Sequence, residues 1–129
     1  MNEIINRLQQ ADGPDRALDV DIVFALYPDI GAYQPHCVGE EPIFWSDPYR
    51  KQPCPQFTAS IDAALTLLPT DYKWTVGFSM HVPHNAEVWV PGLTGYYDGE
   101  CDSNRAIALC IAILRARKAA SAVSSKERA

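Results

Sequence analysis

Residues 104–119 read NRAIALCIAILRARKA and hold the longest apolar run of the chain, which extends from Ala106 to Leu114. Apolar side chains recur along this run at the i, i+3, i+4 and i+7 spacing of a helix, and they form two adjacent stripes. An apolar arc that wide is typical of a helix buried on most of its sides. The stretch therefore predicts a buried helix over 104–119, with Asp102 or Ser103 as its N-terminal cap.

Three short segments before this helix carry strand signals. Residues 72–80 alternate between apolar and polar side chains, which is the period of a half-buried strand. Residues 86–90 and 94–97 predict two more strands, the first ending at Pro91-Gly92 and the second at Asp98-Gly99. Because the connections are short, we expect neighbouring strands to be antiparallel.

Apolar spacing also predicts three further helices, over 2–10, 14–26 and 59–68. Asp12 is placed to cap the second of them, and Thr58 is placed to cap the third. The helices and strands are segregated along the chain and do not alternate. This order favours an α+β domain in which about four helices cover three or four antiparallel strands.

Residues 29–56 form the least regular part of the sequence and are rich in proline and aromatic residues. A structureless loop of this length is uncommon in a compact domain, so we expect one short extended piece over 42–45. Residues 119–129 are small and polar, which predicts a disordered C-terminal tail. Residues 1–118 are then predicted to form a single domain.

The composition is that of an ordinary globular domain. The chain has 129 residues, of which 47% are hydrophobic and 21% are charged, and this argues against intrinsic disorder. The net charge of −5 argues against nucleic-acid binding driven by a basic surface. There is no signal-peptide pattern at the start and no apolar run near the roughly 20 residues of a membrane span. We therefore expect a soluble, cytoplasmic protein without a membrane anchor.

The motifs of the common enzyme classes are missing from the sequence. It has no Gly-rich phosphate loop, no Gly-x-Ser-x-Gly elbow and no His-Glu-x-x-His pair. None of the four cysteines belongs to a Cys-x-x-Cys pair, so free thiols are expected, with Cys110 as a small core residue. The sequence therefore assigns no catalytic residue and no cofactor.

Three stretches, read together, are similar to a known family. They are GPDRALD at 13–19, FTASIDAALTL at 57–67 and RAIALCIAILRAR at 105–117. Their order and spacing resemble the phage ABA sandwich domain family of small prophage-associated bacterial proteins, over roughly residues 3–118. The resemblance implies an α/β/α layered sandwich and a prophage origin, but no chemistry. Arg105 stands where the family has a proline at the start of the last helix.

Aromatic side chains on loops and edge strands are the first candidates for a functional surface, because such residues are enriched in interfaces and pockets. They favour an accessory protein without catalysis that acts by binding a protein partner, or by forming a homo-oligomer. If helices cover both faces of the sheet, as the resemblance implies, several of these side chains belong to the core instead. The set is Tyr33, Phe44, Trp45, Tyr49, Trp89, Tyr96 and Tyr97.

Histidines carry the second hypothesis, a metal-binding or small-molecule-binding module that could include an enzyme. His81 and His84 form a His-x-x-His pair at a predicted turn, and His36 and Cys37 lie in the irregular segment. A metal needs three or four such side chains in one place. Convergence of these residues would support the hypothesis, and their dispersal would refute it.

Charged clusters leave two further possibilities open. Asp12, Asp15, Asp19 and Asp21 could bind a cation, but caps and a solvated helix face explain such a cluster as well. A basic C-terminal end could bind nucleic acid weakly, although helix capping and solubility explain most of it. Its residues are Arg115, Arg117, Lys118, Lys126 and Arg128.

Overall fold

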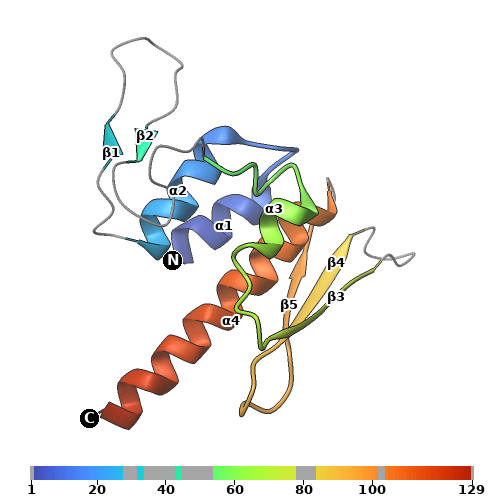
Figure 1. Cartoon of the computed structure of the whole chain (residues 1–129). Coiled ribbons are helices and arrows are strands. Elements are labelled where there is room, and N and C mark those ends of the chain that lie inside the picture. Colours follow the sequence, from blue (N-terminus) through green and yellow to red (C-terminus); the bar gives the residue numbers. More distant parts are fainter. Residues whose placement is uncertain are drawn as a thin grey trace.

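The computed structural model of the chain describes residues 2–27, 32–33, 43–44, 54–77, 84–101 and 104–128, with side chains at 3–27, 54–77, 84–101 and 104–121. The described residues form four helices and a three-stranded antiparallel sheet, which confirms the α+β class (Figure 1). The helices are α1 (Asn2–Gln10), α2 (Arg16–Leu26), α3 (Ile61–Leu65) and α4 (Arg105–Arg128). The strands are β1 (Ala32–Tyr33), β2 (Ile43–Phe44), β3 (Lys73–Gly77), β4 (Asn85–Trp89) and β5 (Tyr97–Glu100).

The main sheet has the order β3-β4-β5, so β3 and β5 are its edge strands. In the ladder Trp74 pairs with Val88, and Val88 pairs with Tyr97. These three side chains therefore lie on the same face of the sheet. Separately, β1 and β2 form a short antiparallel pair, so an extended piece is found within the 42–45 range that the sequence predicts.

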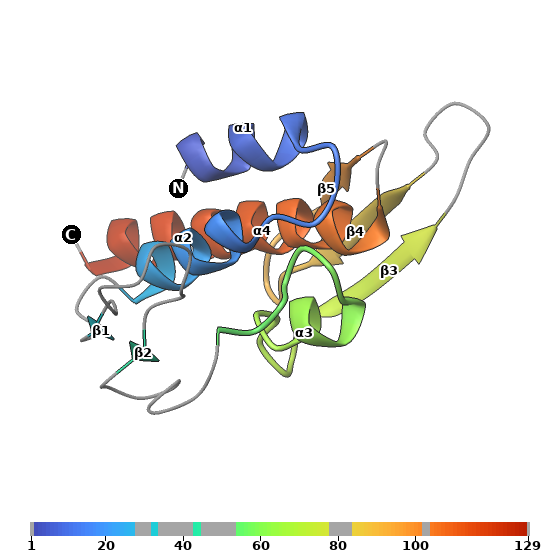
Figure 2. The ribbon, with the colours of Figure 1, turned by 90° about the horizontal axis from the view of Figure 1, so that it is seen from above.

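Helix α4 is the centre of the fold, as its wide apolar arc predicts. Every residue from 106 to 114 is buried, because the sheet packs on one side of α4 while α1 and α3 pack on others. Figure 2 shows α4 lying between α1 and α3, with the strands beyond its N-terminal half. The described elements are thus layered as sheet, α4 and outer helices, and a layered sandwich is compatible with this arrangement.

The third strand differs from its prediction. The sequence places it over 94–97, whereas β5 spans Tyr97–Glu100. Gly92 and Gly95 have φ values of 84° and 81°, so the segment before β5 is a turn that favours glycine. Gly99 ends no strand: it lies inside β5, where a Cβ atom would come within 2.1 Å of the Ala108 carbonyl oxygen of α4. Glycine is required there by the close approach of the helix backbone.

Three helix boundaries also differ from their predictions, and a local hydrogen bond explains each of them. Asp15, not Asp12, caps α2, because its side chain accepts a hydrogen bond from the Leu18 amide. Ser60, not Thr58, caps α3, which is five residues long. Helix α4 begins after Asn104, whose Oδ1 accepts from the Ile107 amide, while Asp102 and Ser103 lie outside the described residues. No described helix has the length and apolarity that crossing a membrane demands.

The C-terminal end of α4 also differs from the predicted tail over 119–129. The helix continues to Arg128. Ala119 and Ala120 are good helix formers, and both are half-buried. They extend the helix beyond residue 118, where the sequence predicted the domain to end.

Candidate functional site

Two of the three stretches that carry the family resemblance, 13–19 and 57–67, meet at one buried polar cluster. Asp19 is fully buried, and its Oδ1 accepts hydrogen bonds of 2.8 Å from both the amide and the hydroxyl of Thr58. Its Oδ2 accepts a 2.8 Å hydrogen bond from Arg16, and the Thr58 hydroxyl accepts one from the Asp15 amide. We call Asp15, Arg16, Asp19 and Thr58 the Asp19 network. Buried polar atoms that are all paired in this way hold a fold together.

The Asp19 network also fixes the chain on either side of it. Arg16 donates to the carbonyl oxygens of Cys54 and Pro55 at 2.7 and 3.3 Å. Asn104 donates to the Thr58 carbonyl at 3.1 Å and so ties the start of α4 to the same point. The network thus joins α2, the segment before α3 and α4. These contacts between distant segments give the network a structural role.

Cys110 lies beside this network and is chemically protected. It is buried in α4, and its thiol donates to the Phe57 carbonyl oxygen at 3.3 Å. Burial raises the pKa of the Cys110 thiol well above its ordinary value, and the negative charge of Asp19 adds to the rise. Because the thiolate is the reactive species, this cysteine is inert in the folded protein. It is a core residue, as the apolar run around it predicts.

The acidic cluster of the second helix is divided among separate tasks. Asp15 caps α2, Asp19 is buried in the network, and Asp21 forms a 2.6 Å ion pair with Arg7 of α1. The prediction that these aspartates lie on a solvated helix face is therefore wrong for Asp19, because residues distant in the chain cover its side chain. Among the described residues, no group of three or more His, Cys, Asp or Glu side chains could hold a metal ion.

Of the residues named in the histidine hypothesis, the structure describes His84 alone. His84 lies beside Asn104 and Arg105 at a small cavity of about 320 Å³, and its buried Nδ1 atom has no hydrogen-bond partner among the described residues. The main-chain oxygen of His84 accepts from the Cys101 amide and continues the β4–β5 ladder. His36, Cys37 and His81 lie outside the described residues, so their convergence with His84 stays a prediction.

The basic end of α4 uses two of its arginines inside the fold. Arg115 donates to the Asp98 carbonyl oxygen at 2.8 Å, and its guanidinium lies 3.7 Å from the Asp98 carboxylate. Arg117 donates to the Leu67 carbonyl oxygen at 2.8 Å. The side chains of Lys126 and Arg128 are not described. Arg115 and Arg117 are thus engaged with β5 and with the segment after α3.

The aromatic candidates separate into three groups. Tyr97 packs against the core on the side of the sheet that faces α4. Trp89 and Tyr96 contact each other, with ring centroids 5.9 Å apart, and Tyr96 is 54% exposed. The remaining candidates lie outside the described side chains: Tyr33 is in β1, Phe44 is in β2, and Trp45 and Tyr49 are in segments that are not described.

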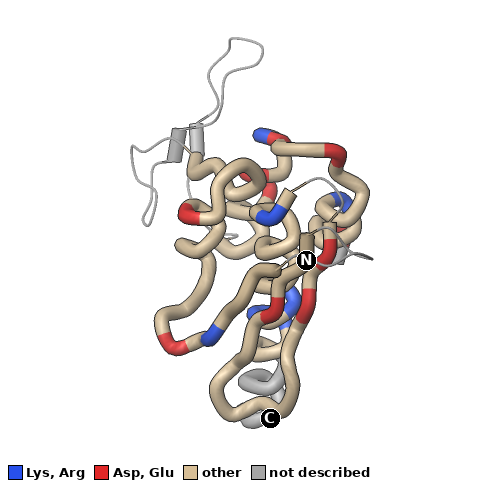
Figure 3. The backbone as a smooth tube through the Cα atoms, turned by 90° about the vertical axis from the view of Figure 1, so that its right-hand side faces the viewer, with Lys and Arg blue, Asp and Glu red and all other residues tan. Residues whose placement is uncertain are grey.

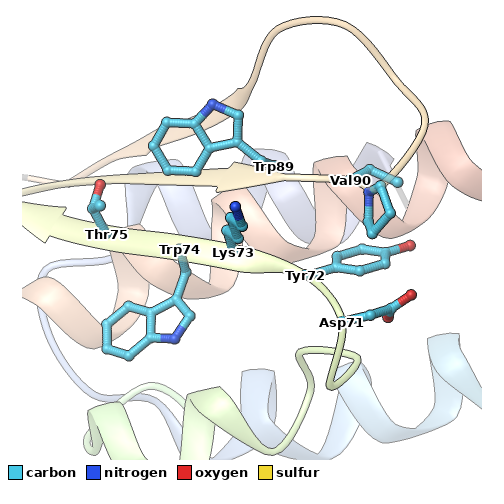
Figure 4. A pocket seen from close by; sticks show the side chains of 8 residues that line it. Asp71, Tyr72, Lys73, Trp74, Thr75, Trp89 and Val90 are labelled. Carbon is cyan, nitrogen blue, oxygen red and sulfur yellow. The ribbon is translucent and has the colours of Figure 1, made fainter.

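A large hollow lies at the β3 edge of the sheet. It has a volume of about 1010 Å³ and is lined by Asp71–Thr75 before and within β3 and by Trp89, Val90 and Pro91 at the end of β4. We call these residues the edge cleft. Figure 4 shows Trp74 and Trp89 pointing to opposite faces of the sheet, so the cleft opens around the strand end. Indole rings on both sides give it a mostly apolar lining with a few polar groups.

Trp74 is the residue of this cleft that sequence reasoning missed as a surface candidate. Its alternation with Val76 assigns it to the buried face, and its neighbour Val88 is indeed fully buried. Trp74 is nevertheless 38% exposed. The cause is its position on an edge strand, because α4 packs mainly against β4 and β5. The sequence carries no signal for which of three strands is at the edge.

The main-chain groups of β3 show which residues face the open edge. His84 bonds towards β5, and bonded residues alternate along an antiparallel strand. Residues 85, 87 and 89 of β4 therefore bond towards β3, where their partners are Gly77, Thr75 and Lys73. The N–H and C=O groups of Trp74 and Val76 point away from β4. In the described part of the chain, nothing pairs with them.

Comparisons of the chain with family models, with curated proteins and with solved structures found no match. The resemblance to the phage ABA sandwich domain family stays a prediction.

Proposed function

We propose that this protein is a binding module without catalysis, which takes a protein partner as an extended strand along the free edge of β3. The observation that carries the proposal is the pair of unpaired main-chain positions, Trp74 and Val76, beside the edge cleft. Strand addition of this kind draws its affinity from main-chain hydrogen bonds and its specificity from pockets next to the strand.

The edge cleft supports this function better than the other described features do. Exposed tryptophan and tyrosine side chains are the residues that most often dominate binding energy at interfaces. Trp74 and Trp89 line the edge cleft. Tyr96 lies next to it, with its ring centroid 5.9 Å from that of Trp89. The family resemblance of the sequence supports an accessory role in a prophage, which we include in the proposal.

Partner capture combined with hydrogen exchange tests the proposal. The tagged chain is used to isolate its partner from extracts of the source cell, and amide exchange is measured with and without that partner. We expect the Trp74 and Val76 amides to exchange rapidly in the monomeric chain and to become protected in the complex. Protection elsewhere, with these two amides unchanged, would contradict the proposal.

Two variants and a matched control sharpen the experiment. Val76→Pro removes an edge donor that the β3–β4 ladder does not use, and Trp74→Ala removes the exposed indole. Phe24→Ala is the control, because Phe24 of α2 is also 38% exposed but lies far along the chain from the cleft. We expect Val76→Pro and Trp74→Ala, once circular dichroism shows that they fold, to bind the partner at least tenfold more weakly than the wild type. Phe24→Ala should bind it with unchanged affinity.

A further inference from the structure

We propose that the partner of the β3 edge is a second copy of this chain, whose own β3 pairs with it to join two three-stranded sheets into a continuous sheet. This inference rests on the proposed function, because it uses the same edge and names what binds there. Symmetric pairs about a two-fold axis are the commonest form of protein oligomer, and they require a surface that is complementary to itself.

The strand has the composition of a pairing edge. β3 is five residues long, contains no proline and carries Lys73 as its single charged residue. A proline, a bulge or a row of charges would discourage edge pairing. Here the one lysine stands at the first position of the strand, which restricts the register of pairing and does not block it.

A two-fold axis at Thr75 is the register that fits this sequence. All five residues then pair, with Trp74 opposite Val76 of the second copy and Lys73 opposite its Gly77. The main-chain groups of Trp74 in each copy then form hydrogen bonds with those of Val76 in the other copy. An axis at Lys73 would instead set two lysines directly opposite, which is unfavourable.

This register also covers the apolar surface that one copy leaves open. Trp74 and Val76 share the face of the sheet that packs on α4, but β3 overhangs that helix, and Trp74 remains 38% exposed. Pairing about Thr75 places Trp74 beside Val76 of the second copy twice. Aromatic and β-branched residues in such cross-strand positions stabilise a sheet.

The charges of the outer face are compatible with the pairing of two copies through β3. On that face β3 carries Lys73, whereas β4 carries Glu87 and β5 carries Asp98 and Glu100, with Glu87 directly opposite Asp98. Figure 3 shows acidic positions grouped on the strands of the sheet and a basic position on the chain beside them. In the joined sheet each Lys73 faces the uncharged Gly77 of the other copy, and Glu87 of that copy lies two strands away. Joining the two β3 edges therefore sets no like charges opposite each other and keeps the acidic strands of the two copies apart.

Cysteine cross-linking tests the register directly. Thr75→Cys places two thiols at a non-hydrogen-bonded pair on the axis, where the Cα atoms are about 4.5 Å apart, within the range of a disulfide. Lys73→Cys is the matched control on the same strand and face, because its copies would lie about 13 Å apart at 3.3 Å per residue. Both are made with Cys37→Ser. Under mild oxidation we expect a covalent dimer for Thr75→Cys and none for Lys73→Cys.

A charge exchange at the axis gives a second, reversible test. Thr75→Lys and Thr75→Glu each place like charges opposite each other in a symmetric dimer, so each alone should sediment as a monomer at concentrations where the wild type is a dimer. An equimolar mixture should form a dimer again. Thr75→Lys that dimerises as well as the wild type would overturn the proposal.

The results separate this inference from the proposed function. A wild-type chain that stays monomeric up to millimolar concentration, with Thr75→Cys no more cross-linked than Lys73→Cys, would overturn self-pairing. Protection of the Trp74 and Val76 amides by a different protein would then leave the binding module standing with another partner. Cross-linking of Lys73→Cys in preference to Thr75→Cys would show a different register and would equally overturn the inference.

Discussion

Asp19 illustrates how one carboxylate can organise contacts between distant segments. It is fully buried, and it accepts hydrogen bonds from Arg16 and from two atoms of Thr58, 39 residues away along the chain. Removal of one member of a buried, hydrogen-bonded charge pair costs more than removal of an exposed pair, because the remaining polar groups lose their partners without regaining water.

Asp19→Ala should therefore destabilise the protein by about 3 kcal/mol. The measurement is the free energy of unfolding from urea titration. Asp12→Ala is the matched control, because Asp12 is an exposed aspartate just before the same helix, and it should change stability by less than about 0.5 kcal/mol. Equal effects of the two substitutions would show that the Asp19 network does not hold the fold.

Cys110 predicts a pH dependence of stability with a definite sign. Burial raises the pKa of its thiol in the folded state, while the unfolded thiol ionises near its ordinary value of about 8.5. The stabilisation is complete below that pH and is lost as the pH rises above it, because only the unfolded state then releases a proton. The stability of the wild type relative to Cys110→Ala should fall between pH 8 and 10, and a flat difference would contradict the assignment.

At the scale of elements, the contact between β5 and α4 depends on a residue that has no side chain. A Cβ atom on Gly99 would lie 2.1 Å from the Ala108 carbonyl oxygen and 2.7 Å from the Ala112 amide nitrogen. Both atoms belong to the backbone of a helix that is buried from residue 106 to 114. Neither the strand nor the helix can move without disturbing the rest of the core.

Gly99→Ala should consequently cost at least about 3 kcal/mol of stability. Gly13→Ala provides the comparison, because a Cβ atom at Gly13 meets nothing within 4 Å. Thermal unfolding of the two variants distinguishes a steric effect from the general effect of replacing glycine. If Gly99→Ala unfolds at the same temperature as Gly13→Ala, the close approach of β5 to α4 is wrong.

At the scale of the whole molecule, charge argues against nucleic acid as a ligand. The net charge is −5, and Arg115 and Arg117 donate hydrogen bonds to main-chain oxygens of the fold. Affinity for nucleic acid depends on cations that are available to neutralise phosphates. We expect no binding of a fluorescent duplex by anisotropy at 50 mM salt (a condition that exaggerates electrostatic attraction). Binding that weakens steeply with added salt would contradict this expectation.

Periodicity predicts most of the elements of this molecule, because its elements follow simple local patterns. The α4 run and the alternation around Trp74 define a buried helix and a strand from spacing alone. The position of β5 and the caps of the helices depend on contacts between distant segments, such as Gly99 with Ala108, and local sequence does not contain them. The edge cleft was missed for the same reason, since strand order in the sheet is a tertiary property.

The anchoring of residues 27 and 54 has a consequence for how this chain could change over time. Tyr27 closes α2 by donating its amide proton to Val23, and Arg16 holds the carbonyl oxygen of Cys54. The two points where the chain leaves and rejoins the described core are thus fixed by bonds of the core itself. The entropy of closing a loop between fixed ends rises only with the logarithm of its length. A change in the length of the stretch between these anchors therefore alters its closure entropy only slightly, since doubling the length costs about 0.6 kcal/mol.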